Sequence, residues 1–141
     1  MNDWITPNWP APLNVRALFT TRSGGISSGP YTNFNLGNHV GDKEHIVHQN
    51  RAKLLNALPS EPKWLNQVHG STPIWVDNNT NSLRGDAALS KSKNIVCAIL
   101  TADCLPVFLC DEAGTVVGIV HAGWRGLVAG VIEQAVAEMR R

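Results

Sequence analysis

The chain has 141 residues, of which 43% are hydrophobic and 16% charged, which is the ordinary composition of one globular domain. Its formal net charge of +1 gives no basic field for nucleic acid or anionic lipid, so neither partner is predicted and a small-molecule substrate is favoured. The start of the sequence has no basic and apolar leader, and no apolar run approaches the ~18–20 residues of a membrane span, which predicts a cytoplasmic protein.

The N-terminal part contains one expected strand, one long loop and one expected helix. Residues 15–21 alternate apolar and polar side chains, which predicts a strand. Residues 22–42 are rich in Gly, Ser, Asn and Pro, but interleaved large side chains favour an ordered functional loop over a flexible linker. Asp42 is a candidate N-cap for a helix that extends to Leu55. Ile46, Asn50 and Leu54 are spaced four apart along this helix, and Leu55 lies beside them.

Short strands are expected in the middle of the chain. Residues 64–68 and 74–76 have the composition of strands. Residues 94–100 form an apolar run without alternation, which is typical of a strand covered on both faces. The polar residues 78–85 are predicted to form a surface loop.

A hairpin is predicted near the C-terminal end. Two apolar runs, residues 107–110 and 116–120, are joined by the turn-forming sequence DEAG. Cys104 precedes the first run and His121 follows the second, so both side chains are expected to face one site. The loop AGWRG then leads into a predicted helix with a continuous apolar stripe. The stripe contains Leu127, Val128, Val131, Ile132, Ala135, Val136 and Met139.

A third candidate, His69, also follows an expected strand and precedes a tight loop. The imidazoles of His69 and His121 and the thiolate of Cys104 form a ligand set suited to zinc, with a fourth position left open. Their long separations in sequence are unlike the short pairs of zinc fingers, so spacing alone does not specify a metal, and simply hydrogen-bonded histidines are the alternative. The same atoms also suit nucleophilic catalysis, with Cys104 as the thiolate and one histidine as the base.

Three further side chains are candidates for substrate chemistry. Asp103, beside the cysteine, is a candidate general base, or it closes the turn through hydrogen bonds to the backbone. Arg125 lies at the start of the last helix, where a phosphate or carboxylate could bind. Arg22, which is followed by Ser and two Gly, is a similar candidate for binding an anion. For both arginines, a surface salt bridge is the alternative.

The other cysteines and histidines are assigned to the core or the surface. Three cysteines without the spacing of a disulfide framework indicate reduced thiols. Cys97 and Cys110 lie within apolar runs and are expected in the core. His45 and His48 are expected on an exposed helix face, and His39 is a candidate for the rim of a pocket.

The chain resembles the YfiH-type family, also called the laccase-domain or polyphenol oxidase family, from Trp9 to the final helix. The similar motifs are FTTRSGGIS, GPYTNFNLGNHVGD, WLNQVHG, TADCLPV and HAGWRG. The resemblance implies an α/β fold, a layered sandwich of mixed β-sheets covered by helices, in which residues 1–141 form a single, incomplete domain. It also implies a zinc site at His69, Cys104 and His121, and purine nucleoside phosphorylase activity on adenosine, inosine and methylthioadenosine, together with adenosine deaminase activity.

Several alternatives stay open at this point. Family members are longer, and the additional part would complete the sheet and the pocket, which leaves the activity of the 141-residue form open. An uncovered edge of the sheet would allow self-association. Other functions within reach are a cytoplasmic amide hydrolase that edits a peptidoglycan precursor, a copper polyphenol oxidase, and an inactive binding module. Five histidines, two of them on an expected exposed helix, cannot furnish both copper centres of a multicopper oxidase, which favours zinc over copper.

Overall fold

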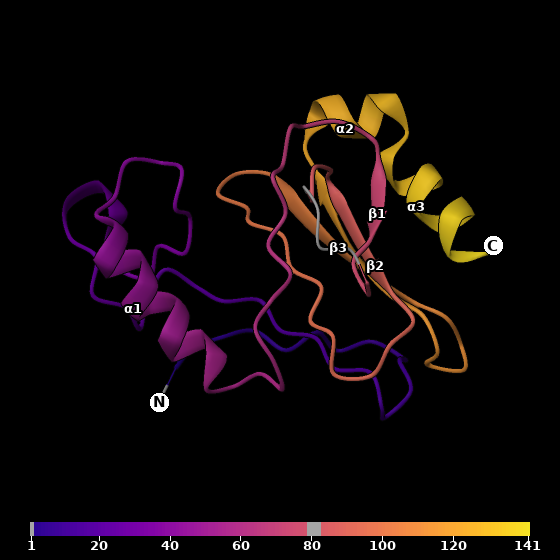
Figure 1. Ribbon diagram of the computed structural model, residues 1–141, viewed down its shortest axis with the longest axis horizontal. Coiled ribbons are helices and arrows are strands. Elements are labelled where there is room, and N and C mark those ends of the chain that lie inside the picture. Colours follow the sequence, from indigo (N-terminus) through magenta and orange to yellow (C-terminus); the bar gives the residue numbers. More distant parts are fainter. Residues whose placement is uncertain (1, 79–82) are drawn as a thin grey trace. The chain divides into compact units, whose positions relative to one another are not determined.

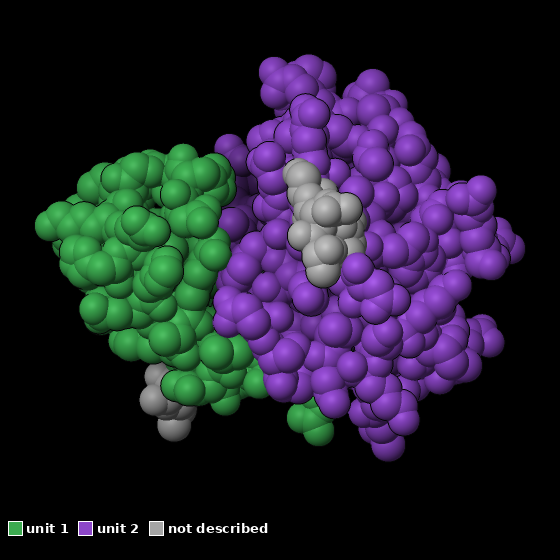
Figure 2. Space-filling model, viewed as in Figure 1, with its two compact units in different colours: residues 1–10, 16–58 green, residues 11–15, 59–141 purple. Residues whose placement is uncertain are grey.

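The computed structural model describes residues 2–78 and 83–141, and its contacts cluster into two compact units. Unit 1 comprises residues 1–10 and 16–58, and unit 2 comprises residues 11–15 and 59–141 (Figure 2). The assignment of residues 1–141 to one domain stays a prediction.

Unit 1 contains a short 3-10 helix, η1 (Gly29–Tyr31), and one α-helix, α1 (Glu44–Leu55). The buried residues of α1 are Val47, Asn50 and Leu54. Ile46 is half-buried, and its neighbour Val47 is fully buried. The predicted N-cap is wrong: Lys43 occupies that position, and Asp42 accepts hydrogen bonds from the Lys43 N–H at 2.8 Å and the Ser27 hydroxyl at 2.7 Å.

The Gly-rich loop of unit 1 is ordered by a buried amide of α1. The side chain of Asn50 donates to the Asn35 carbonyl at 2.8 Å and to the Ser27 hydroxyl at 2.9 Å, and it accepts from the Ile26 N–H at 3.0 Å. These bonds satisfy both ends of the buried amide, so the loop is held in one conformation by α1. The expectation of an ordered loop over residues 22–42 is confirmed.

The strand predicted over residues 15–21 is wrong. In this segment only Phe19 pairs with another chain segment, through two backbone hydrogen bonds of 2.8 Å to Ile5. In this antiparallel register Pro7 would face Ala17, and it has no N–H to donate, so the ladder does not extend from the bridge in that direction.

Unit 2 is built on one mixed four-stranded sheet (Figure 1), and the order of its strands is β1-β2-β4-β3. Its strands are β1 (Pro73–Trp75), β2 (Ala87–Ser90), β3 (Leu105–Cys110) and β4 (Val117–Ala122). The pair β1 and β2 is parallel, and the other two pairs are antiparallel. The predicted α/β fold with a mixed sheet is therefore confirmed, and so is the hairpin formed by β3 and β4.

Two predicted strands of unit 2 are wrong, and one strand was not predicted. Residues 64–68 and 94–100 form only isolated bridges, at Asn66 with Arg84 and at Cys97 with Lys63, and Asn94 lies in a turn. The apolar side chains of these segments pack on the sheet without joining its ladder. The strand predicted at residues 74–76 corresponds to β1, whereas β2 was missed because its residues, AALS, are few and small. Residues 79–82 of the predicted surface loop lie outside the described residues.

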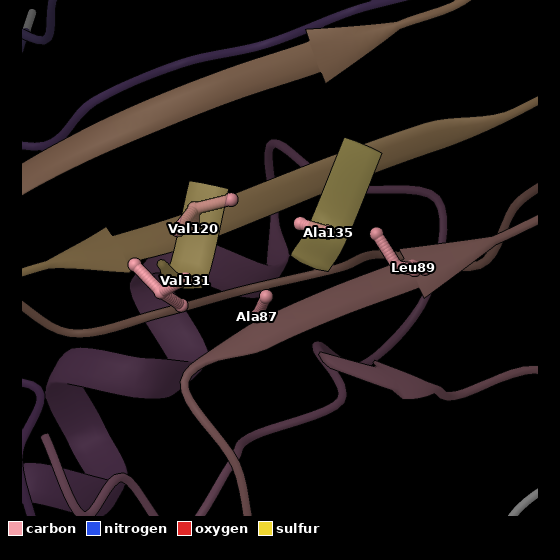
Figure 3. Close-up of a cluster of buried hydrophobic side chains, with 5 residues drawn as sticks. All are labelled: Ala87, Leu89, Val120, Val131 and Ala135. Atoms are coloured by element: carbon pink, nitrogen blue, oxygen red, sulfur yellow. The ribbon is translucent and has the colours of Figure 1, made fainter. Parts of the chain in front are cut away.

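Two hydrophobic clusters cover the two faces of the sheet. On one face, Ala87, Leu89 and Val120 pack against Val131 and Ala135 of helix α3 (Val131–Met139), as Figure 3 shows. The cluster on the other face consists of Leu65, Val76, Ala88 and Ile119, with Cys97 and other partly buried residues beside it. Helix α3 thus covers one face of the sheet, and the segments 64–68 and 94–100 cover the other.

The predicted C-terminal helix is two helices. Helix α2 (Trp124–Ala129) ends at Gly130, which has a φ of 85° and separates α2 from α3. This left-handed conformation suits glycine and redirects the chain, so Val128 is 83% exposed rather than part of a buried stripe. No helix in the described part of the chain is long and apolar enough to cross a membrane.

Candidate metal centre

Three predicted ligands meet at one end of the sheet in unit 2. The donor atoms of His69, Cys104 and His121 all lie within 4.8 Å of one another. His121 belongs to β4 and pairs with Pro106, Cys104 immediately precedes β3, and His69 lies in the loop before β1. The imidazole rings of the two histidines pack edge to face, with centroids 4.8 Å apart. The hairpin therefore brings Cys104 and His121 together as expected, although His121 lies inside the strand rather than beyond it.

A buried carboxylate contacts the ring of His121. The Nδ1 atom of His121 lies 2.7 Å from Oδ2 of Asp86, and both residues are buried. A carboxylate accepts this hydrogen bond, so in the neutral ring the proton lies on Nδ1 and Nε2 has the lone pair that can bind a metal. Hydrogen bonding between a carboxylate and a ligating histidine is the usual arrangement around a metal.

The same carboxylate holds the backbone around His69. The N–H groups of Val68, His69 and Gly70 donate to Asp86 over 3.0, 2.9 and 3.0 Å. His69 has a φ of 59°, a left-handed conformation that costs a residue with a side chain about 1–2 kcal/mol. Three hydrogen bonds to one charged group offset that cost and fix the direction in which His69 leaves the loop.

Asp86 is ionised despite its burial. Burial disfavours the charge, but hydrogen bonds from His121 and from three backbone N–H groups outweigh this effect and hold the pKa of Asp86 below its ordinary value. Sequence reasoning missed this residue. The only signal was a single acidic residue placed directly before the apolar residues of β2.

Two glycines allow close packing around the ligands. A Cβ atom on Gly123 would lie 3.0 Å from Sγ of Cys104 and 3.4 Å from the His69 ring. A Cβ atom on Gly126 would lie 3.0 Å from the carbonyl oxygen of Gly70. The two glycines of the HAGWRG motif therefore let the start of α2 approach the ligand-bearing loops.

Cys104 has the surroundings of a ligand rather than of an activated nucleophile. Its thiol is within 3.5 Å of Oδ1 of Asp103, which is exposed. Burial, together with the hydrogen bond and negative charge of Asp103, raises the pKa of the Cys104 thiol in the metal-free chain. A thiol with a raised pKa is a poor nucleophile at neutral pH, whereas a bound metal ion would displace its proton.

The two candidate anion-binding arginines have different contacts. The guanidinium of Arg125, two residues beyond Gly123, lies 4.6 Å from the centre of the Trp124 ring, and both side chains are exposed. Arg22, in unit 1, donates through Nε and Nη2 to the Thr32 carbonyl at 3.2 and 3.0 Å. Arg22 thus has a structural role in its loop, and anion binding by either arginine stays a prediction.

The donor set fits a metal ion of the zinc type. Two imidazole nitrogens and one thiolate are common zinc ligands, and the carboxylate behind His121 supplies the expected outer contact. Copper also binds two histidines and one cysteine, so the donor types by themselves allow both metals. His39, His45 and His48 are not part of this group, and His45 and His48 are exposed on α1 as predicted.

The three cysteines are expected to differ in their reactivity toward iodoacetamide. Burial raises the pKa of Cys97 to about 12, so at pH 8 only about one molecule in ten thousand carries its thiolate. Cys104 should therefore be alkylated well before Cys97 in metal-free protein, and zinc should slow only the labelling of Cys104. Peptide mass spectrometry over time measures the three rates. Faster labelling of Cys97 than of Cys104, or equal zinc protection of Cys110, would refute this expectation.

Comparison with known proteins decides the family. The family described as "Multi-copper polyphenol oxidoreductase laccase" matches residues 16–141. The chain belongs to this family. The predicted resemblance to the YfiH-type, laccase-domain family is therefore confirmed.

Relatives in the laccase family carry the name of a purine nucleoside phosphorylase. A purine nucleoside phosphorylase of Pseudomonas aeruginosa is 52% identical over 136 residues, which cover 96% of this chain and 56% of the relative. Purine nucleoside phosphorylase YfiH of Escherichia coli is 49% identical over 140 residues, which cover 97% of this chain and 58% of the relative. The chain thus spans a little over half the length of the curated relatives it matches.

Solved structures share the fold of this laccase-family chain. A crystal structure of a Neisseria meningitidis protein superposes with a TM-score of 0.91 at 42% identity and covers 99% of this chain and 58% of its own length. YlmD from Geobacillus stearothermophilus superposes with a TM-score of 0.85 at 30% identity, over 95% of this chain and 54% of its own length.

Proposed function

We propose that this chain is the metal-binding part of a zinc-dependent purine nucleoside phosphorylase that acts on adenosine, inosine and methylthioadenosine and also deaminates adenosine. The observation that carries the proposal is the convergence of His69, Cys104 and His121, in a chain about half identical to proteins named purine nucleoside phosphorylase. Among residues 2–78 and 83–141 this is the one such group of donors, whereas a multicopper oxidase needs separate copper centres. Zinc therefore suits the site better than copper.

The proposed reaction assigns distinct tasks to the chain's own residues. Phosphorolysis breaks the bond between N9 of the purine and C1′ of the ribose, an oxygen of phosphate forms the new bond to C1′, and the base leaves with a proton. Asp103 is exposed beside Cys104 and is proposed to hold the transferred proton. Arg125 is proposed to bind the phosphate, with Arg22 as a second anion-binding candidate. When bound, the metal would supply a Lewis acid that stabilises negative charge.

A phosphate-dependence assay tests the proposal. The full-length protein is expected to release adenine from adenosine and hypoxanthine from inosine only when inorganic phosphate is present, whereas deamination would yield inosine and ammonia without it. Cys104→Ala should abolish release and lower the bound zinc, because a thiolate ligand is lost. Cys110→Ala, at the opposite end of β3, is the matched control, and this variant should keep both the release of the base and the bound zinc.

Other outcomes would point to other functions. Product formation that is unchanged by Cys104→Ala would contradict the proposal. Bound zinc without turnover of nucleosides would favour a binding module, and turnover of a peptidoglycan precursor in a parallel assay would favour an amide hydrolase. Stoichiometric copper with visible colour would favour the oxidase that the family description names.

A further inference from the structure

One buried carboxylate joins two of the three ligand-bearing segments. Asp86 stands immediately before β2, and its side chain has no exposed surface. Its Oδ1 accepts from the N–H groups of Val68 and Gly70, and its Oδ2 accepts from the His69 N–H and from Nδ1 of His121. All four donors converge on this single group, so the loop before β1 and the ring on β4 are tied together through it.

We propose that Asp86 is a positioning residue that prepares the metal centre before any metal binds, by fixing both the backbone that carries His69 and the tautomer of His121. This inference rests on the metal-binding part of the proposed function. Asp86 would explain why His69 and His121 are directed toward the same site, although the three cysteines of the chain are free and form no disulfide.

The geometry requires a carboxylate rather than another acceptor. Each oxygen of Asp86 receives two donors, so both oxygens must be acceptors. An asparagine has only one acceptor oxygen, and its NH₂ group must face either Val68 and Gly70 or His69 and His121. In the first case two loop N–H groups lose their partner. In the second case the NH₂ donates to Nδ1 of His121, and the proton moves to Nε2, where it blocks metal binding.

Asp77 offers a matched control. Its Oδ1 accepts from the Ser90 hydroxyl at 2.7 Å and from the N–H groups of Lys91 and Ser92 at 3.0 and 2.9 Å. Asp77 therefore also ties a side chain and a loop backbone together, at the other end of β2, but it contacts none of the three ligands. All three donors meet Oδ1, so Asp77→Asn can keep these bonds through its amide oxygen and tests whether a change from Asp to Asn beside β2 alters zinc binding by itself.

The experiment measures zinc affinity by competition with a chromogenic chelator, for the wild-type chain, Asp86→Asn and Asp77→Asn. Asp86→Asn is expected to weaken zinc binding about 10- to 100-fold, which is the usual effect of removing such a contact. Asp77→Asn is expected to bind zinc within threefold of the wild type. Equal affinities of the wild type and Asp86→Asn would overturn the inference, whereas a wild-type chain that binds no zinc would refute the metal-binding part of the proposed function.

A second measurement needs no variant and no metal. Long-range ¹H–¹⁵N NMR spectra of the metal-free wild-type chain should show His121 as the Nδ1–H tautomer. Observation of the Nε2–H tautomer would overturn the inference, even if Asp86→Asn did not fold. In folded Asp86→Asn, the inference expects either the Nε2–H tautomer of His121 or altered amide shifts at Val68 and Gly70. Neither change is expected in Asp77→Asn.

Discussion

Replacing Leu89 with alanine is expected to lower the free energy of unfolding by about 3 kcal/mol, within the usual range for a fully buried leucine. Leu89 has no exposed surface and lies on β2, between β1 and β4. Its side chain covers Gly118, where an added Cβ atom would lie 2.7 Å from a Leu89 methyl group. Neighbouring side chains come from strands and from α3, so they cannot close around the cavity without moving the sheet.

Urea unfolding measures this effect, and the sequence offers a matched control. Leu13→Ala removes the same atoms from a residue that is 99% exposed, so its effect should stay within about 0.5 kcal/mol. Similar losses for both variants would show that the sheet is not packed as described.

Replacing Gly25 with alanine is expected to destabilise unit 1 by roughly 3 kcal/mol, at the upper end of the range for overpacking. An added Cβ atom would clash with the carbonyl oxygen of Asn33, and it would lie 2.6 Å from Cα of Phe34 and 2.7 Å from Oδ1 of Asn50. Two of these neighbours are backbone atoms that cannot rotate away. The third is the amide that orders the loop, so the substitution should also disturb the hydrogen bonds of Asn50.

Gly37→Ala is the control for this prediction because it lies in the same loop. A Cβ atom added at Gly37 would lie 3.4 Å from its nearest neighbour, which is an ordinary van der Waals distance, so little loss of stability is expected. Thermal unfolding followed by circular dichroism compares the two variants. Equal unfolding temperatures for Gly25→Ala and the wild type would contradict the described packing of the loop.

Local sequence patterns predicted the elements whose partners are close in the chain. The hairpin of β3 and β4 was found because its two apolar runs and their turn are adjacent in sequence. Helix α1 was found from its spacing, although its N-cap is Lys43 rather than Asp42. Strand β2 was missed because a short strand buried between two others has no alternating pattern of apolar and polar residues. The break at Gly130 was missed because it depends on the left-handed conformation of a single residue.

The sequence by itself determined which residue types are available for a metal centre, and the resemblance of its long motifs gave the family. Tertiary structure decided how those residues are held. His69, Cys104 and His121 come from three segments that only the folding of unit 2 brings within 4.8 Å. Asp86 showed no functional signal in the sequence, because its role depends on four donors from two distant segments that converge on it. A local pattern cannot encode such a convergence, since it arises from the packing of the strands.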